Sequence, residues 1–275
     1  MTVGRALAET TERLAAAACE SPRVDAEILV AQVLGTTRSQ LVLEHARELG
    51  DSDVATLETL VARRETREPL AYVLGEWGFR RLTLRVDRRV LVPRPETEIV
   101  VERCMQRIAG IEAPRVLDVG TGSGAIALAI ADEHPGAVVT GVDASVGALE
   151  VAGANASASG LAVELREWDF FAGLPDGPWN LVVSNPPYVL PDEIGTLEPE
   201  VRDWEPREAL VGIGATEAVA RGALDVLRRG GALVLEVAAG DADRVAGLLG
   251  DLGYVDVTVR ADLTGRDRVV EGTRS

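Results

Sequence analysis

The first 74 residues have the hydrophobic spacing of helices. From Val3 to about Leu74, Leu, Ala, Val and Ile recur at steps of three and four residues, and no convincing alternating run interrupts them. This spacing places the apolar side chains on one face of each helix. Ser21 and Pro22 mark one helix start, because Ser is a favoured N-cap and Pro is tolerated in the first turn. Residues 1–74 are therefore predicted to form a small helical bundle.

The pattern changes after Gly75, where apolar and polar positions alternate. The apolar positions of this stretch are Phe79, Leu82, Leu84, Val86 and Val90. Such alternation predicts a short hairpin. Pro93 and Pro95 end it, because proline lacks the N–H that a strand ladder needs, and a helix is expected over residues 96–108. Residues 75–94 are thus predicted to link two domains.

From Arg115 onward, short apolar runs alternate with helical stretches. The expected strands are residues 116–119, 138–142, 163–165, 181–184, 232–237 and 255–260, with a last one around Val269. Strands that alternate with helices predict a mostly parallel sheet with helices on both of its faces. The fold class expected for residues 95–275 is therefore α/β.

Composition and charge narrow the classes of function. The chain has 275 residues, of which 47% are hydrophobic, and 28 Lys and Arg stand against 44 Asp and Glu, for a net charge of −16. This describes a soluble globular protein with one large domain or two unequal ones. Wide contact with a nucleic-acid backbone is disfavoured, because such affinity comes mainly from clustered Lys and Arg.

The residue types that often build metal or acid–base sites are scarce. Cys19 and Cys104 are the only cysteines and lie 85 positions apart, so no disulfide framework and no metal site is expected. The only histidines, His45 and His134, fall in the helical part and at a helix end, where we expect surface or core roles. No apolar run approaches the roughly 18 residues that cross a bilayer, and no secretory signal pattern is present. We expect a cytoplasmic protein without membrane contact.

A glycine-rich loop, Asp118–Gly124, follows a predicted buried strand and opens a helix rich in Ala, Ile and Leu. Glycines let the backbone approach a ligand closely beside the helix N-terminus, which favours a nucleoside cofactor there. Gly120, Gly122 and Ala125 also satisfy the dinucleotide fingerprint, so S-adenosylmethionine and a nicotinamide dinucleotide both remain open. Asp118 is expected to order the loop.

An acidic residue, Asp143, ends the next strand, about 20 residues after the glycine loop. A carboxylate at this place can accept hydrogen bonds from both hydroxyls of a ribose. The alternative is an N-cap for the helix that starts near Ser145. The sequence allows either role.

The segment Asn185-Pro186-Pro187-Tyr188 follows another buried strand. Because proline has no N–H and a restricted φ, the segment presents carbonyl oxygens rigidly and without competing donors. The Asn185 side-chain oxygen and the Pro186 carbonyl can each accept one hydrogen of an amide or aromatic amine NH₂, and Tyr188 can stack on the flat group. Such acceptors favour the electron-rich nitrogen of a transition state, which indicates methyl transfer to nitrogen. The alternative is a rigid turn after a strand.

These motifs, together with further segments, give the chain its resemblance to the HemK/PrmC family of release-factor glutamine methyltransferases. The similarity spans nearly the whole chain. Besides the two motifs, it includes residues 21–27, 68–72, 92–98, 205–206, 209–210 and 262–268. The resemblance implies the class I S-adenosylmethionine-dependent fold, with a Rossmann-like, mostly parallel seven-stranded sheet and a small N-terminal helical domain.

The resemblance also implies an activity and a partner. The family methylates the N5 amide nitrogen of the glutamine in the Gly-Gly-Gln (GGQ) loop of bacterial class 1 peptide chain release factors, with S-adenosyl-L-methionine as the methyl donor. The N-terminal bundle would then dock the release factor, with residues 21–27 as the candidate contact. The alternative for these residues is a structural role, because they carry a helix-capping pattern. We expect a monomer, and nucleic acid is not an expected partner.

Site residues carry over from the family motif by motif. The methionine part of the cofactor would be held by Gly120, Thr121, Gly122, Ser123 and Gly124. Asp143 would bind the ribose, and Phe170, which follows Asp169, would pack on the adenine. The glutamine amide would lie against Asn185, Pro186, Pro187 and Tyr188. Asn185 would also contact the cofactor. The catalytic residues would be Asn185, Pro186 and Tyr188.

Two segments depart from the family pattern. After Glu205-Pro206 the chain reads Val211-Gly-Ile-Gly-Ala-Thr216 where the family often has Gly-Gly-x-x-Gly, and Leu235–Ala238 replaces Leu-Glu-x-Gly. Both lie outside the two chemical motifs, so they bear on substrate fit or loop geometry.

The alternative functions are methylation of a ribosomal protein glutamine, N6-adenine methylation of nucleic acid, and a nicotinamide-dependent oxidoreductase or binding module.

Overall fold

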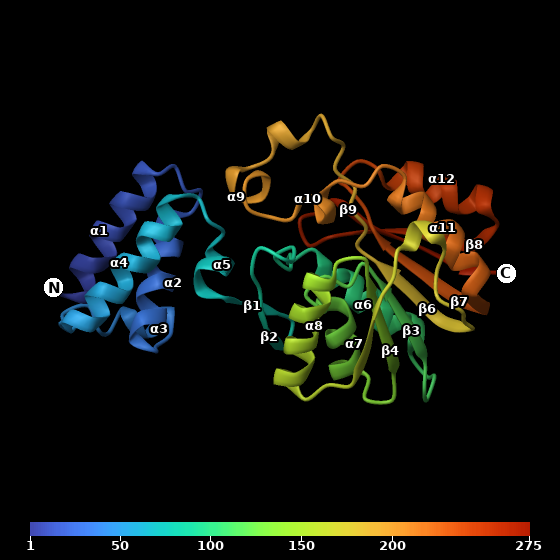
Figure 1. Ribbon diagram of the computed structural model, residues 1–275, viewed down its shortest axis with the longest axis horizontal. Coiled ribbons are helices and arrows are strands. Elements are labelled where there is room, and N and C mark those ends of the chain that lie inside the picture. Colours follow the sequence, from blue (N-terminus) through green and yellow to red (C-terminus); the bar gives the residue numbers. More distant parts are fainter. The chain divides into compact units, whose positions relative to one another are not determined.

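The computed structural model describes residues 1–275, and the contacts within the chain divide it into two units (Figure 1). Unit 1 contains Met1–Glu76 together with Glu198–Trp204, and unit 2 contains Trp77–Leu197 and Glu205–Ser275. The chain therefore passes between the units three times. The segment Glu198–Trp204 is far in sequence from the rest of its unit.

Unit 1 is helical, as the hydrophobic spacing predicts. Its buried side chains include Leu14, Leu29, Leu57 and Val61, which come from the three long helices and pack into one core. The helices of the unit are α1 (Val3–Ala16), α2 (Pro22–Leu34), α3 (Arg38–Leu41), α4 (Asp51–Glu65), α5 (Leu70–Leu74) and α9 (Pro199–Arg202). Pro22 is the first residue of α2, and Gly35 ends this helix in the left-handed conformation that glycine favours.

A buried ion-pair network holds the segment Glu198–Trp204 within unit 1. The Arg64 guanidinium donates to Asp25 Oδ2 at 2.8 Å and lies 2.8 Å from Glu200 Oε1. Arg67 Nε donates to the same Glu200 oxygen at 2.7 Å. Asp25 and Arg64 are both buried, so Asp25, which lies in the segment 21–27 considered for docking, contributes to the interior of the unit.

Unit 2 contains a seven-stranded sheet in the order β5-β4-β3-β6-β7-β9-β8. The first five strands of this order run parallel, and β9 is antiparallel to both of its neighbours. This confirms the α/β, mostly parallel sheet. The strands are β3 (Arg115–Val119), β4 (Val138–Asp143), β5 (Val163–Glu167), β6 (Trp179–Ser184), β7 (Leu227–Glu236), β8 (Tyr254–Ala261) and β9 (Asp267–Arg274).

One strand begins earlier than its hydrophobic run predicts. β7 starts at Leu227, which pairs with Trp179, whereas the apolar run starts only at Ala232. Of the residues between them, Arg228, Arg229 and Gly230 are exposed and Gly231 is buried. Because backbone hydrogen bonds do not depend on side-chain polarity, the ladder extends beyond the stretch that the hydrophobic pattern marks.

Helices cover both faces of the sheet (Figure 1). One core contains Val100 of α6, Ile130 of α7 and Val116 of β3, and the other contains Val219 of α11 with Leu249 of α12. The longer helices of unit 2 are α6 (Thr97–Ile108), α7 (Ala125–Glu133), α8 (Val146–Ser159), α11 (Ala215–Val226) and α12 (Ala242–Leu252). Short helical turns are η1 (Phe170–Ala172), η2 (Ile194–Thr196) and α10 (Arg207–Leu210). No helix of the structure combines the length and the apolar character needed to span a bilayer.

The predicted hairpin is formed by β1 (Glu76–Phe79) and β2 (Leu82–Arg85). Its second strand is fastened to α8, because Asn155 accepts a hydrogen bond from Arg85 N at 2.7 Å and donates one to Arg85 O at 3.0 Å. Asn155 also donates to Ser123 O at 2.9 Å. One buried amide thus connects the hairpin to the glycine-rich loop.

The strand order brings the sequence motifs to one edge of the sheet. β3 lies between β4 and β6, and Val119 at its end is in register with Val142 and with Ser184. The residues that follow these three positions are the glycine-rich loop, Asp143 and Asn185. In open α/β sheets, ligands bind beyond the carboxyl ends of strands where the strand order reverses, and β3 and β6 flank such a point here.

Candidate active site

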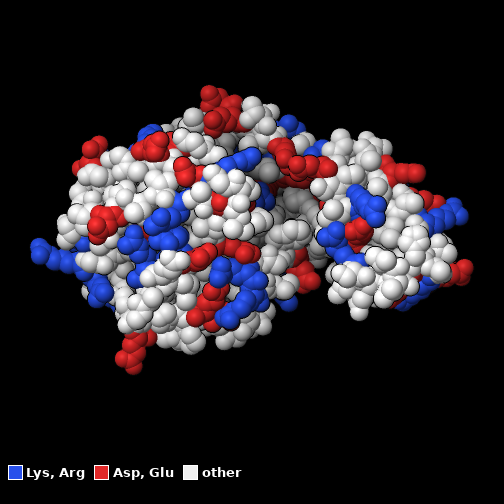
Figure 2. Space-filling model, turned by 180° about the vertical axis from the view of Figure 1, so that it is seen from behind, with Lys and Arg blue, Asp and Glu red and all other residues white.

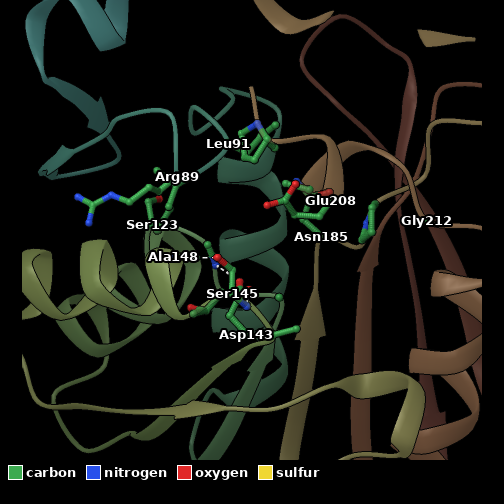
Figure 3. A pocket seen from close by; sticks show the side chains of 18 of the residues that line it. Arg89, Leu91, Ser123, Asp143, Ser145, Ala148, Asn185, Glu208 and Gly212 are labelled. Carbon is green, nitrogen blue, oxygen red and sulfur yellow. Dashed lines mark hydrogen bonds between the residues drawn. The ribbon is translucent and has the colours of Figure 1, made fainter. Parts of the chain in front are cut away.

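A cavity of about 580 Å³ lies at the carboxyl edge of the sheet in unit 2 (Figure 3). Its wall comes from six separate stretches of the chain. These stretches lie within residues 89–97, 120–126, 143–148, 169–171, 185–187 and 206–212. The volume is within the range of about 300–1,000 Å³ that is usual for small-molecule sites.

The glycine-rich loop lines this cavity with its backbone. Gly120, Gly122 and Gly124 have φ values of +72°, +56° and +83°, a region that glycine enters without steric cost. A Cβ at Gly120 or Gly122 would have no heavy atom within 4 Å, so the backbone there borders open space. Gly120 N and Thr121 N both donate to Val142 O, at 2.8 and 2.9 Å, which fastens the loop to β4.

The five residues expected to hold the methionine part of a cofactor do not all border the cavity. Gly120, Thr121, Gly122 and Ser123 do, whereas Gly124 does not. A Cβ at Gly124 would lie 3.1 Å from Leu128 Cδ1 and 3.3 Å from the Ala152 Cβ. Gly124 therefore allows close packing at the start of α7.

Asp118 orders the glycine-rich loop through hydrogen bonds to the residues that follow it. Its side chain is fully buried, and Oδ2 accepts from Thr121 Oγ1 at 2.6 Å and from Ala127 N at 3.2 Å. Oδ1 has no hydrogen-bond partner. Burial raises the pKa of Asp118 to about 7, against the opposing effect of these hydrogen bonds.

Asp143 borders the cavity and contacts two backbone segments. Oδ2 accepts from Gly122 N at 2.9 Å, and Oδ1 accepts from Ser145 N at 2.9 Å. The N-cap of α8 is Ser145, whose hydroxyl accepts from Ala148 N at 3.2 Å. Burial raises the pKa of Asp143, and the two backbone donors oppose that rise. Each carboxylate oxygen has a second lone pair, so Asp143 can accept further hydrogen bonds.

Asn185 and Pro187 line the cavity, whereas Pro186 and Tyr188 do not. The strand before them is fixed by Ser184, whose hydroxyl donates to Val119 O at 2.7 Å. Burial raises the pKa of the Tyr188 hydroxyl. Of the four residues expected to contact a substrate amide, the two that border the cavity are therefore the first and the third.

The loop that departs from the family pattern contacts this motif closely. A Cβ at Gly212 would lie 2.5 Å from Pro187 Cγ and 2.6 Å from Pro187 O, so only glycine fits there. Val189 N donates to Leu210 O at 2.9 Å, and Val189 forms a bridge with Val211. The altered loop thus retains a glycine at the point of closest approach.

Aromatic residues form another part of the wall. Phe170 borders the cavity, as does Phe171, and their ring centroids are 4.7 Å apart. Asp169, which also borders the cavity, caps the short helical turn by accepting from Phe171 N at 2.9 Å. The sequence motif indicated Phe170 but not Phe171.

Several polar residues near the cavity were not among the predicted site residues. Buried Glu205 accepts from Arg94 Nη2 at 2.6 Å and from Val92 N at 3.2 Å, and Thr97 lies between Asn185 and buried Glu236. The sequence did show that residues 92–98 and Glu205 belong to segments shared with the family. It did not show which residues of these segments contact one another. Neither histidine borders the cavity.

Comparisons with known proteins identify the family. Residues 5–75 match the PrmC N-terminal domain, and residues 96–196 match the methyltransferase small domain. The chain is 42% identical over 263 residues to the release factor glutamine methyltransferase of Chlorobaculum tepidum, covering 90% of this chain and 89% of that one. It is 42% identical over 275 residues to the protein of the same name from Deinococcus radiodurans, covering 98% and 97%.

A solved structure agrees on the fold. The T. thermophilus 16S rRNA N2 G1207 methyltransferase in complex with AdoMet and guanosine superposes with a TM-score of 0.54 at 18% identity, over 73% of this chain and 50% of that chain. At this identity the likeness shows the class I methyltransferase fold alone. From the two full-length relatives and the two domain matches, the chain belongs to the release factor glutamine methyltransferase family.

Proposed function

We propose that this protein transfers a methyl group from S-adenosyl-L-methionine to the side-chain N5 of the glutamine in the GGQ motif of bacterial class 1 peptide chain release factors. The observation that carries the proposal is the convergence of three motifs on one cavity. Gly122, Asp143 and Asn185 are far apart in sequence and all border it. The membership of the chain in the family supports the same activity.

The residues around the cavity fit S-adenosylmethionine. Gly120 and Gly122 present bare backbone to open space, which suits close approach of the methionine part together with Thr121 and Ser123. Asp143 retains acceptor capacity for ribose hydroxyls, as does the Asn185 amide for a polar group of the cofactor. Phe170 offers a flat apolar face for adenine. When bound, the cofactor supplies an electrophilic methyl group on a sulfonium.

Asn185 and Pro186 would hold the substrate amide. Each offers one oxygen to one hydrogen of the glutamine NH₂, and the restricted φ of the prolines keeps these oxygens in place. In the transition state the amide nitrogen loses its planarity and its lone pair becomes available to the methyl group. Two oxygens that accept both N–H hydrogens stabilise this state more than they stabilise the planar amide. Tyr188 would cover the amide group by stacking. Orientation of the nitrogen supplies much of the acceleration.

Residues 1–74 would serve as the docking domain for the release factor, residues 75–94 as the linker and residues 95–275 as the methyltransferase domain. The match of residues 5–75 to the PrmC N-terminal domain supports this division. We further propose that the enzyme acts as a monomer on a protein and not on nucleic acid. The net charge of −16 supports the exclusion of nucleic acid, as does the face in Figure 2, where Arg side chains are interspersed with Asp and Glu.

The test is methylation of a purified release factor. Intact-mass measurement before and after incubation with enzyme and S-adenosylmethionine should show the addition of one methyl group. Fragmentation should locate that group on the GGQ glutamine. A release factor in which this glutamine is replaced by alanine is the matched control and should gain no mass. Methylation of a ribosomal protein or of RNA or DNA instead of the release factor would overturn the proposal.

A further inference from the structure

A chain of two hydrogen bonds connects Asn185 to a buried acid. Asn185 Nδ2 donates to Thr97 Oγ1 at 3.4 Å, and Thr97 Oγ1 donates to Glu236 Oε2 at 2.6 Å. The three residues come from three elements: Asn185 follows β6, Thr97 begins α6 and Glu236 ends β7. Thr97 is 4% exposed and Glu236 is 2% exposed. These two hydrogen bonds therefore connect the wall of the cavity to the interior of unit 2.

The chemistry of the groups gives this chain a direction. An ionised carboxylate can only accept, and a threonine hydroxyl has one hydrogen. The short bond to Glu236 uses that hydrogen, so Thr97 Oγ1 can only accept from Asn185. The Asn185 group that faces Thr97 must then be the NH₂, because the amide oxygen in its place would oppose another oxygen. The amide oxygen of Asn185 is left free for other partners.

We propose that Thr97 and Glu236 are positioning residues that orient the Asn185 amide so that its oxygen, and not its NH₂, receives the substrate amide. The inference rests on the proposed function, since it concerns how a glutamine NH₂ is bound. Figure 3 shows the Asn185 side chain among those that line the cavity, where Glu208 is also drawn. A flipped Asn185 would present hydrogens to hydrogens and could not hold the substrate nitrogen.

The charge of Glu236 controls the direction of the two hydrogen bonds between Asn185, Thr97 and Glu236. Burial raises the pKa of Glu236 to about 7, and Glu96 adds to the rise, whereas the hydrogen bond from Thr97 and the charges of Arg268 and Arg94 oppose it. Glu236 in turn adds to the rise in the pKa of the Tyr188 hydroxyl. A protonated Glu236 can donate to Thr97, which frees the threonine hydrogen for the Asn185 oxygen and reverses the amide. Methyl transfer should therefore increase as the pH rises through about 7.

The first test removes only the hydroxyl that joins the two groups. Thr97→Val keeps the shape of the side chain and leaves nothing to fix the Asn185 amide, so kcat should fall by about 10- to 100-fold. The Kd of S-adenosylmethionine, measured by calorimetry, should change by less than about threefold. Thr97→Ser restores a hydroxyl and should recover most of the loss in kcat. Equal activity of the Val and Ser variants would overturn the proposal, as would a loss confined to cofactor binding.

The second test separates the titration of Glu236 from that of other groups. Glu236→Gln can still offer a carbonyl oxygen to Thr97 but does not ionise, so the fall in kcat below about pH 7 should disappear. Cofactor affinity measured over the same pH range controls for Asp118, whose pKa is also about 7. An unchanged acidic limb in Glu236→Gln would overturn the proposed role of the charge.

A readout without methyl transfer distinguishes failure of this inference from failure of the proposed function. In ¹⁵N-labelled enzyme, the side-chain amide resonance of Asn185, assigned with Asn185→Asp, should titrate near pH 7 in the wild type and not in Glu236→Gln. If the wild type shows this titration but does not methylate release factors, the proposed function is refuted and the proposed orientation of the Asn185 amide still holds. Methyl transfer by an enzyme whose Asn185 resonance is insensitive to pH and to Thr97→Val would refute the orientation alone.

Discussion

Glu205 accepts a 2.6 Å hydrogen bond from the Arg94 guanidinium, although the two residues are 111 positions apart. The Glu205 side chain is almost fully buried, and its other oxygen accepts from Val92 N at 3.2 Å. Since both Val92 and Arg94 border the cavity, one carboxylate holds a stretch of the cavity wall. This stretch belongs to the segment between the hairpin and α6.

Replacing Glu205 should therefore weaken both the fold and cofactor binding. Glu205→Leu leaves the Val92 N–H and the Arg94 charge without their acceptor, which should lower the free energy of unfolding by about 2–4 kcal/mol. Urea-induced unfolding gives the loss of stability, and calorimetry gives cofactor affinity. Glu208→Gln, at an exposed position three residues after Glu205, is the control for stability and should unfold within about 0.5 kcal/mol of the wild type. Equal stability of the two variants would contradict the role given to Glu205.

Asn185 and Asp143 should fail in different ways. Asn185→Ala removes an acceptor for the substrate amide, so kcat should fall by about 100-fold or more with a smaller effect on cofactor affinity. Asp143→Ala removes a charged acceptor from the cavity, so the Kd of S-adenosylmethionine should rise by about 10- to 100-fold. Initial rates and calorimetry measure the two effects. Equal loss of cofactor binding in both variants would show that the division of roles is wrong.

Gly212 should not tolerate a side chain. Gly212→Ala places a Cβ 2.5 Å from Pro187 Cγ, so Pro187 or the loop must move, at a cost of about 1–3 kcal/mol. We expect a lower kcat, because Pro187 adjoins the two residues that would hold the amide. Gly195→Ala is a matched control, since a Cβ there would have no heavy atom within 4 Å. Activity of Gly212→Ala equal to that of Gly195→Ala would contradict the steric argument.

Glu200 should stabilise the segment that unit 1 takes from the middle of the chain. Glu200→Gln weakens its pairs with buried Arg64 and with Arg67, so the free energy of unfolding of unit 1 should fall by about 2–3 kcal/mol. Limited proteolysis should then cut within residues 198–204 more rapidly. Arg202→Ala removes a more exposed pair with Asp203 and should have almost no effect. Identical cleavage rates in the two variants would be inconsistent with this network.

Asp118 should make stability depend on pH. Its folded-state pKa of about 7 is above the usual value for aspartate, so the folded protein binds the proton more tightly than the unfolded chain. The stabilisation from this proton is fully present below the unfolded pKa and is lost as the pH rises through about 7. Asp118→Asn should remove this contribution. Thermal unfolding of both proteins from pH 5 to 8 measures it, and parallel curves would exclude Asp118 as the source.

Local patterns in the sequence determined much of the fold. The spacing of apolar residues predicted the helices of residues 1–74 and the alternating strands and helices after Arg115, because amphipathic periodicity follows from helix and strand geometry. The glycine-rich loop and Asn185–Tyr188 were recognisable from another local signal, the glycines and prolines that follow predicted strands. Glycine permits backbone conformations that other residues avoid, and proline fixes φ, so both motifs can be recognised within a short stretch of sequence. The roles assigned to these site residues stay predictions that the variants above will test.

Only the tertiary structure decided which distant residues meet. The pairs Arg94–Glu205 and Thr97–Glu236 join positions more than 100 residues apart, and Glu198–Trp204 belongs to unit 1 although both of its neighbouring segments belong to unit 2. No periodicity encodes such contacts, because they depend on strand order and on how buried charges find partners in the folded chain. Propensity and spacing act over a few residues, whereas a buried carboxylate is stabilised by whichever donors the fold brings to it.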